Sequence, residues 1–296
     1  MSVPAFEALS TPWAPHPEVW VLVAGVVALA AYAVRVIGPK VVPAGEAVVT
    51  GRQKRWFVAG LVTLWLASDW PVHDIAEGRF YSVHMVQHTL LTLAVAPMFL
   101  LATPTWLARL VVGDGWFAGS ALRFLCRPVV AGPLFNFVAI FLHWQNTVNA
   151  SVANPALHFG LHTLAVAAAL LMWTAVCGPL PERRMSIPGQ MVYLFLMSIV
   201  PTVPAAWLTF ADGVVYRAYA GLGVDAVQDQ QIAGLVMKLG AGFYLWGIII
   251  FLFFRWANRH MAVEKAGRTL TEREVLTWES VEAELAAAPP APREHI

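Results

Sequence analysis

Long apolar runs separated by short polar segments fill most of the chain between residues 19 and 254. A membrane-spanning helix needs about 20 predominantly apolar residues, and most of these runs approach that length. We interpret seven runs as spans, at residues 19–37, 56–68, 82–102, 129–143, 156–176, 191–210 and 232–254. The pattern therefore predicts an all-α fold, a polytopic membrane bundle of about seven helices.

Basic residues between the apolar runs predict the orientation of this bundle. One set of loops and the tail carry most of the Lys and Arg residues, and the opposite loops carry only Arg79 and Arg217. Because cytoplasmic loops are enriched in Lys and Arg, we expect the N-terminus outside and the C-terminus in the cytoplasm. Residues 1–18 then form an outer segment, 19–254 the transmembrane domain, and 255–296 a cytoplasmic tail. A capping box at Thr271 and Glu274 predicts one short helix in the tail, followed by a disordered end.

Composition supports a membrane location and excludes one class of partner. The chain of 296 residues is 58% hydrophobic and 12% charged, with a mean hydropathy of +0.63. A soluble domain carries about twice that share of charge. The formal net charge of +1 gives no reason to expect a nucleic-acid partner. No basic segment precedes the first apolar run, so we expect no cleaved signal peptide.

Histidines concentrate at the predicted outer ends of three spans. His84 and His88 lie four residues apart and therefore share one face of the third span, and His158 and His162 repeat this spacing in the fifth. His143 ends the fourth span at the same predicted depth. Polar side chains inside a membrane are costly unless they pair, face water or bind something. These five histidines are therefore candidates for a shared function.

Imidazoles from three helices at one depth can converge on a metal ion, since neutral imidazole is a common metal ligand. Asp229 opens the seventh span and is either a further ligand or orients a histidine. Met237, about two turns deeper, offers a thioether that suits Cu(I). The predicted metal ligands are His84, His88, His143, His158, His162, Asp229 and Met237. His73 is interpreted as a loop histidine, and His16 is expected to have no function.

Three motifs give the chain a resemblance to a known family. The segment HMVQHTLLTLAVAPMFLLATP from His84, the H-x-x-x-H pair at His158 and His162, and DQQIAGLVM from Asp229 resemble the CtaG family. These proteins are polytopic assembly factors for cytochrome c oxidase, unlike the single-span copper chaperone of the same name. The resemblance implies a non-enzymatic membrane protein of the bacterial inner membrane. It also implies copper delivery to a haem–copper oxidase, with an oxidase subunit or another copper-handling membrane protein as partner.

The residues alone leave other functions open. His88 and His162 on facing helices suit the axial ligands of a haem b in an electron-transfer protein. Three histidines and an acid also suit a zinc hydrolase, with Asp229 or Asp74 as general base. A structural partner of the oxidase, with hydrogen-bonded histidines, is the remaining alternative. A split site, with His84, His88 and Asp74 beside the other three histidines, is open as well.

Overall fold

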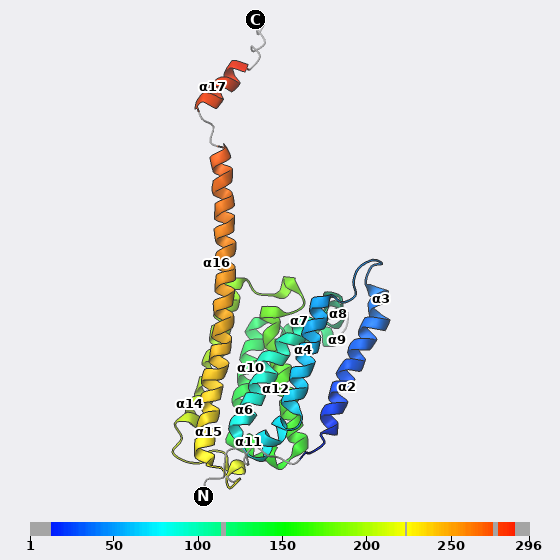
Figure 1. Cartoon of the computed structure of the whole chain (residues 1–296), viewed down its shortest axis with the longest axis vertical. Coiled ribbons are helices and arrows are strands. Elements are labelled where there is room, and N and C mark those ends of the chain that lie inside the picture. Colours follow the sequence, from blue (N-terminus) through cyan, green and yellow to red (C-terminus); the bar gives the residue numbers. More distant parts are fainter. Residues whose placement is uncertain (1–12, 114–116, 223, 275–277, 288–296) are drawn as a thin grey trace. The chain divides into compact units, whose positions relative to one another are not determined.

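The computed structural model describes residues 13–113, 117–222, 224–274 and 278–287, and every regular element within these ranges is a helix (Figure 1). The all-α prediction is confirmed for these residues. The elements up to the second third of the chain are α2 (Pro17–Tyr32), η1 (Ala33–Ile37), α3 (Gly38–Val41), α4 (Gly51–Ser68), α5 (Val72–Gly78), α6 (Tyr81–Thr89), η2 (Leu90–Val95), α7 (Ala96–Ala102), α8 (Thr105–Val111), α9 (Phe117–Leu125), α10 (Pro128–Leu142), α11 (Gln145–Ala153) and α12 (Pro155–Cys177). They are followed by η3 (Pro181–Arg183), α13 (Ile187–Ile199), α14 (Thr202–Thr209), η4 (Arg217–Tyr219), α15 (Ala226–Leu235), η5 (Val236–Gly240), α16 (Ala241–Glu274) and α17 (Trp278–Ala287).

Five helical stretches among the described residues are long and apolar enough to cross a membrane. They are Pro17–Val41, Tyr81–Ala102, Pro155–Cys177, Ile187–Thr209 and Ala226–Glu264. The bent pair Gly119–Leu125 and Pro128–Leu142, with an angle of 77° between its halves, makes a sixth if it counts as one span. The chain is thus a polytopic helical membrane protein.

The prediction of seven spans is not confirmed by helix length and hydropathy. The segment read as the second span lies in α4, which is helical but carries Arg52, Lys54 and Arg55 in its first turns. The segment read as the fourth span lies in α10, which by itself has only 15 residues. Both segments are helices, but their length or charge separates them from the other five. The predicted orientation remains a prediction.

A wide helical turn separates α6 from α7. Pro97 has no N–H with which to continue the helix, and the π-turn η2 directly precedes it. Within η2, the carbonyl of Thr92 accepts a hydrogen bond of 2.9 Å from the indole of Trp173 in α12. This bond fixes α12 against the helix that carries His84 and His88.

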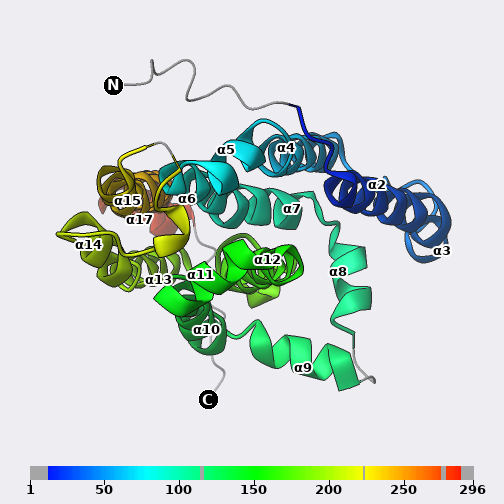
Figure 2. The same cartoon turned by 90° about the horizontal axis from the view of Figure 1, so that it is seen from below.

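The first compact unit, Met1–Ile250, holds the helical bundle. Seen along the helices, α12 lies between α7 on one side and α10 on the other (Figure 2). At the predicted outer end, α6 packs against α5 and α15. A buried cluster that includes Tyr81, Met85, Tyr216 and Tyr219 fills this end.

The second unit, Phe251–Ile296, holds the rest of α16 and the short helix α17. Helix α16 continues without a break to Glu274, so Thr271 lies inside a helix and not at an N-cap. The predicted start of a new helix at Thr271 is therefore wrong. The predicted disordered end, from residue 288 onward, lies outside the described residues.

Candidate metal centre

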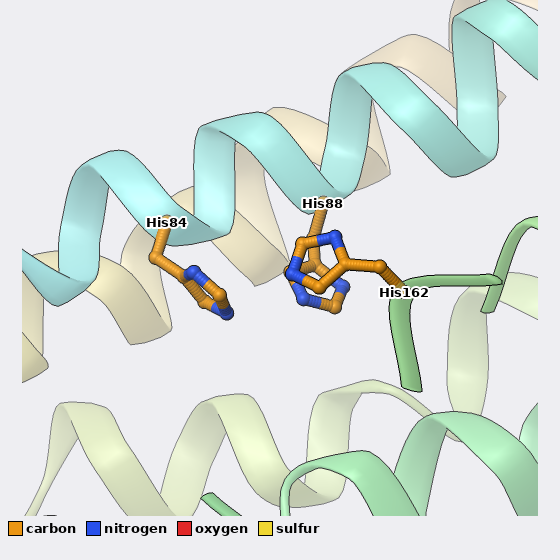
Figure 3. Close-up of side chains that lie close together, drawn as sticks. All are labelled: His84, His88 and His162. Carbon is orange, nitrogen blue, oxygen red and sulfur yellow. The ribbon is translucent and has the colours of Figure 1, made fainter. Parts of the chain in front are cut away.

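Three histidines from two helices form the densest group of potential metal ligands. His84 and His88 project from one face of α6, and His162 projects from α12 toward them (Figure 3). One ring nitrogen from each lies within 4.8 Å of the others. The ring centroids are 4.6 Å apart for His84 and His88, and 4.4 Å for His88 and His162. We call His84, His88 and His162 the trihistidine centre.

Local sequence explains why α12 delivers its histidines to this place. The side chain of Asn154 accepts hydrogen bonds from the backbone N–H groups of Ala156 and Leu157, and Pro155 occupies the first turn. These features start the helix just before His158, since an Asn N-cap and an early proline both favour a helix N-terminus. His158 and His162 therefore occupy its first two turns, on one face.

Two nitrogens of the trihistidine centre are buried without a hydrogen-bond partner. They are Nδ1 of His84 and Nε2 of His162. Leaving a buried polar atom unsatisfied costs about 1–3 kcal/mol, so native proteins rarely keep such atoms without a reason. Two unsatisfied imidazole nitrogens that face a third imidazole have the donor chemistry of a metal site. The residues present therefore fit a metal ion.

His143 lies beside this centre with its metal-binding nitrogen available. Its Nδ1 is 2.6 Å from the carbonyl oxygen of Ala139, and a carbonyl can only accept, so Nδ1 carries the proton. Metal-bound histidines commonly donate their other ring N–H to a backbone carbonyl in this way. The free lone pair on Nε2 then lies 3.3 Å from the sulfur of Met85. The ring of His143 is 6.3 Å from that of His88.

Met237 lies near the trihistidine centre but does not belong to its three converging residues. It is buried, and it lines a cavity of ≈ 100 Å³ together with Met85, His88 and His143. Lys238 lines the same cavity and donates a hydrogen bond of 2.6 Å to the hydroxyl of Thr202.

Asp229 is placed at the start of α6 and not in the trihistidine centre. Its carboxylate accepts hydrogen bonds from the backbone N–H groups of Tyr81, at 2.6 Å, and Ser82, at 3.3 Å, and from the Ser82 hydroxyl. A carboxylate at a helix N-terminus satisfies free N–H groups and interacts well with the helix dipole. In the structure Asp229 thus holds the start of the helix that carries His84 and His88, and its predicted role as a ligand stays a prediction.

His158 faces a second group of side chains, on the predicted outer side. Its Nε2 lies 2.6 Å from Oε1 of Glu77, which is also 3.2 Å from Nε2 of His73. Burial alone would raise the pKa of Glu77, but the contact with His158 and the nearby imidazole charges lower it below its usual value. Burial lowers the pKa of His73, so this imidazole is neutral at pH 7. His73, interpreted as a loop histidine, thus belongs to this group, and the ring of His16 lies 4.8 Å from the ring of His73.

Sequence reasoning missed two residues of the region. Met85 follows His84 directly and so shares no i, i+4 spacing with the other candidates. Glu77 lies in α5, in a segment read as an outer loop, and only the fold brings it to His158. The grouping also differs from the proposed split site, because His162 joins His84 and His88, and Asp74 pairs with His16 at 2.9 Å.

The charge of the ligand set limits the ions that it suits. Imidazole and thioether ligands are neutral, and the cost of burying an ion rises steeply with its charge. This cost and the thioether of Met85 favour a monovalent, soft ion such as Cu(I), and three imidazoles also form sites for Zn²⁺.

Comparison with known proteins gives one family and no individual relative. No curated protein and no solved structure matches the chain significantly. The model of the family described as cytochrome c oxidase caa3 assembly factor (CtaG) matches residues 13–259, a range that includes every histidine of the site. Because this match covers most of the sequence, the chain belongs to the family of cytochrome c oxidase caa3 assembly factors.

Proposed function

We propose that this protein binds copper at the trihistidine centre and delivers it to a cytochrome c oxidase in the bacterial inner membrane. The observation that carries the proposal is the convergence of His84, His88 and His162, two of which keep a buried nitrogen without a partner. The family assembles an oxidase whose catalytic centre needs copper, and the centre offers ligands that suit Cu(I).

The geometry supports release of the metal as well as its binding. A transfer protein must give up its metal, so a site with a few neutral ligands beside open space suits this task better than a closed four-ligand site. His162 borders a cavity of ≈ 990 Å³, and His88 borders the smaller cavity near Met85. The metal is cargo in this account, and no catalytic step is assigned to the protein.

The haem alternative receives less support from the spacing of the histidines. Axial ligands of a haem approach the iron end-on from opposite faces of the macrocycle. The rings of His88 and His162 are only 4.4 Å apart, with an angle of 48° between their planes. This leaves no room for a porphyrin between them.

The test of the function is oxidase maturation in cells. We expect a strain without the native gene to make a copper-poor oxidase, and wild-type protein to restore its copper and activity. The variant His88→Ala/His162→Ala should not restore them, whereas His260→Ala, an exposed histidine far along α16, should. Full oxidase copper in cells that carry only the double variant would contradict the proposal.

A further inference from the structure

The carboxylate of Glu77 and the imidazole of His158 face each other in an unusual way. Their atoms Oε1 and Nε2 are buried and form an ion-pair contact of 2.6 Å, and neither atom has another hydrogen-bond partner. In a tetrahedral site with metal–ligand distances of about 2.0–2.1 Å, two ligand atoms lie about 3.3 Å apart. Glu77 and His158 are closer than this, so a cation that replaced the proton between them would move the two atoms apart by about 0.7 Å.

His73 supports the carboxylate from the other side. The amide nitrogen of Gln87 lies 3.2 Å from Nδ1 of His73, and an amide nitrogen can only donate. Nδ1 therefore accepts, and the proton of the neutral ring is on Nε2, which lies 3.2 Å from Glu77. His73 is thus a positioning residue for Glu77, and Gln87 in turn fixes His73.

A continuous series of imidazoles links this group to the trihistidine centre. The ring of His158 is 4.3 Å from that of His162 and 5.4 Å from that of His84. In the other direction, the ring of His73 contacts that of His16 at the start of α2. One cavity of ≈ 990 Å³ borders His73, Glu77, His158 and His162, so an ion has space to move along them.

We propose that Glu77 and His158 form a second cation site, which receives the copper ion before it reaches the trihistidine centre. This inference rests on the proposed function. Glu77 supplies the negative charge that the neutral centre lacks, and such a charge beside a cavity raises the local concentration of cations. Two protein ligands hold an ion only weakly, so the ion moves on to the three imidazoles.

The test is the rate of copper loading, measured separately from the final copper content. Full-length protein in detergent is mixed without oxygen with Cu(I) held by a coloured chelator, and the loss of colour is followed. We expect Glu77→Gln to load about tenfold more slowly or worse, since that is the lower range for charge-guided association. The final content should equal that of the wild type. His73→Ala should also slow loading, and Glu77→Asp should restore part of the rate.

The control is Glu182→Gln, which removes the exposed carboxylate that pairs with Arg109. It should load at the wild-type rate. Glu77→Gln loading at the wild-type rate, or a control that loads equally slowly, would overturn the second site and leave the trihistidine centre intact. A wild-type protein that binds no copper at equilibrium would instead overturn the proposed function. If Glu77→Gln does not fold, the copper-loading rate of His73→Ala is the test. A His73→Ala protein that loads at the wild-type rate would then overturn the second site.

Discussion

Asp229 in α15 accepts a hydrogen bond of 2.6 Å from the backbone N–H of Tyr81, the first residue of α6. The residue 148 positions away in the sequence thus caps the helix that carries His84 and His88. Because Ser82 donates to the same carboxylate through its backbone and its hydroxyl, this helix end is held in one place. The position of His84 and His88 in the trihistidine centre therefore depends on a carboxylate that lies outside it.

This relationship separates capping from metal binding in one pair of variants. Asp229→Ala should lower the free energy of unfolding by about 0.5–2 kcal/mol, the usual cost of losing a cap. Asp229→Asn keeps an oxygen that can accept, so it should lose less stability and retain its copper. Thermal unfolding in detergent and copper content of the purified variants are the measurements. An Asp229→Asn protein that is folded but free of copper would mean that Asp229 is a ligand.

Met85 should contribute to copper affinity more than Met237 does. The sulfur of Met85 is 3.3 Å from Nε2 of His143, whereas Met237 only shares the cavity beside them. We expect Met85→Leu to weaken Cu(I) binding about tenfold, the lower range for a lost supporting group at a metal site. Met237→Leu should change it little, because Leu conserves the volume. Competition with a Cu(I) chelator measures both, and a larger effect of Met237→Leu would reverse the assignment.

Gln228 and Gln230, which flank Asp229, differ in burial, and this difference allows a stability test. Gln230 is buried, and its oxygen accepts from the N–H groups of Val215 and Tyr216 while its nitrogen donates to the Tyr216 carbonyl. Gln230→Ala leaves these buried backbone groups unpaired, so it should cost about 1–3 kcal/mol. Gln228 is exposed, and Gln228→Ala should be within about 0.5 kcal/mol of the wild type. Equal melting temperatures for the two variants would show that this network contributes nothing.

The indole of Trp173 should matter for the alignment of the two histidine-bearing helices. Trp173→Phe removes the hydrogen bond to the Thr92 carbonyl and leaves a partly buried acceptor unpaired. We expect a loss of about 1–3 kcal/mol in stability and weaker copper binding, because α12 carries His162. Unfolding and chelator competition measure the two effects. A protein that loses stability but keeps its copper affinity would show that this bond does not align the centre.

The spacing of the histidines along the chain predicted which of them share a helix face. His84 and His88 share a face because they are one turn apart, and the same holds for His158 and His162. The structure brings His84, His88 and His162 together as that spacing implied, and it places His143 next to them.

Other parts of the site depend on contacts between distant segments, which no local pattern contains. Asp229 was predicted as a ligand because it has a carboxylate and opens the seventh span at the predicted depth of the histidines. In the structure, α15 directs this carboxylate to the N–H groups of Tyr81 and Ser82. Glu77 was read as part of a loop, and only the fold, in which α5 packs against α6, brings it to His158 in α12. The number of spans stays a prediction, because helix length and hydropathy mark five or six of the seven expected stretches as long and apolar enough to cross a membrane.

The most direct test of the account is the copper content of the purified protein after loading with Cu(I) without oxygen. The wild type should hold about one copper ion per chain, because the described residues form one group of three converging ligands. His88→Ala/His162→Ala should hold almost none while remaining folded, and His260→Ala should match the wild type. Copper that stays bound to the double variant at the wild-type level, or a wild-type protein that binds none, would contradict the trihistidine centre.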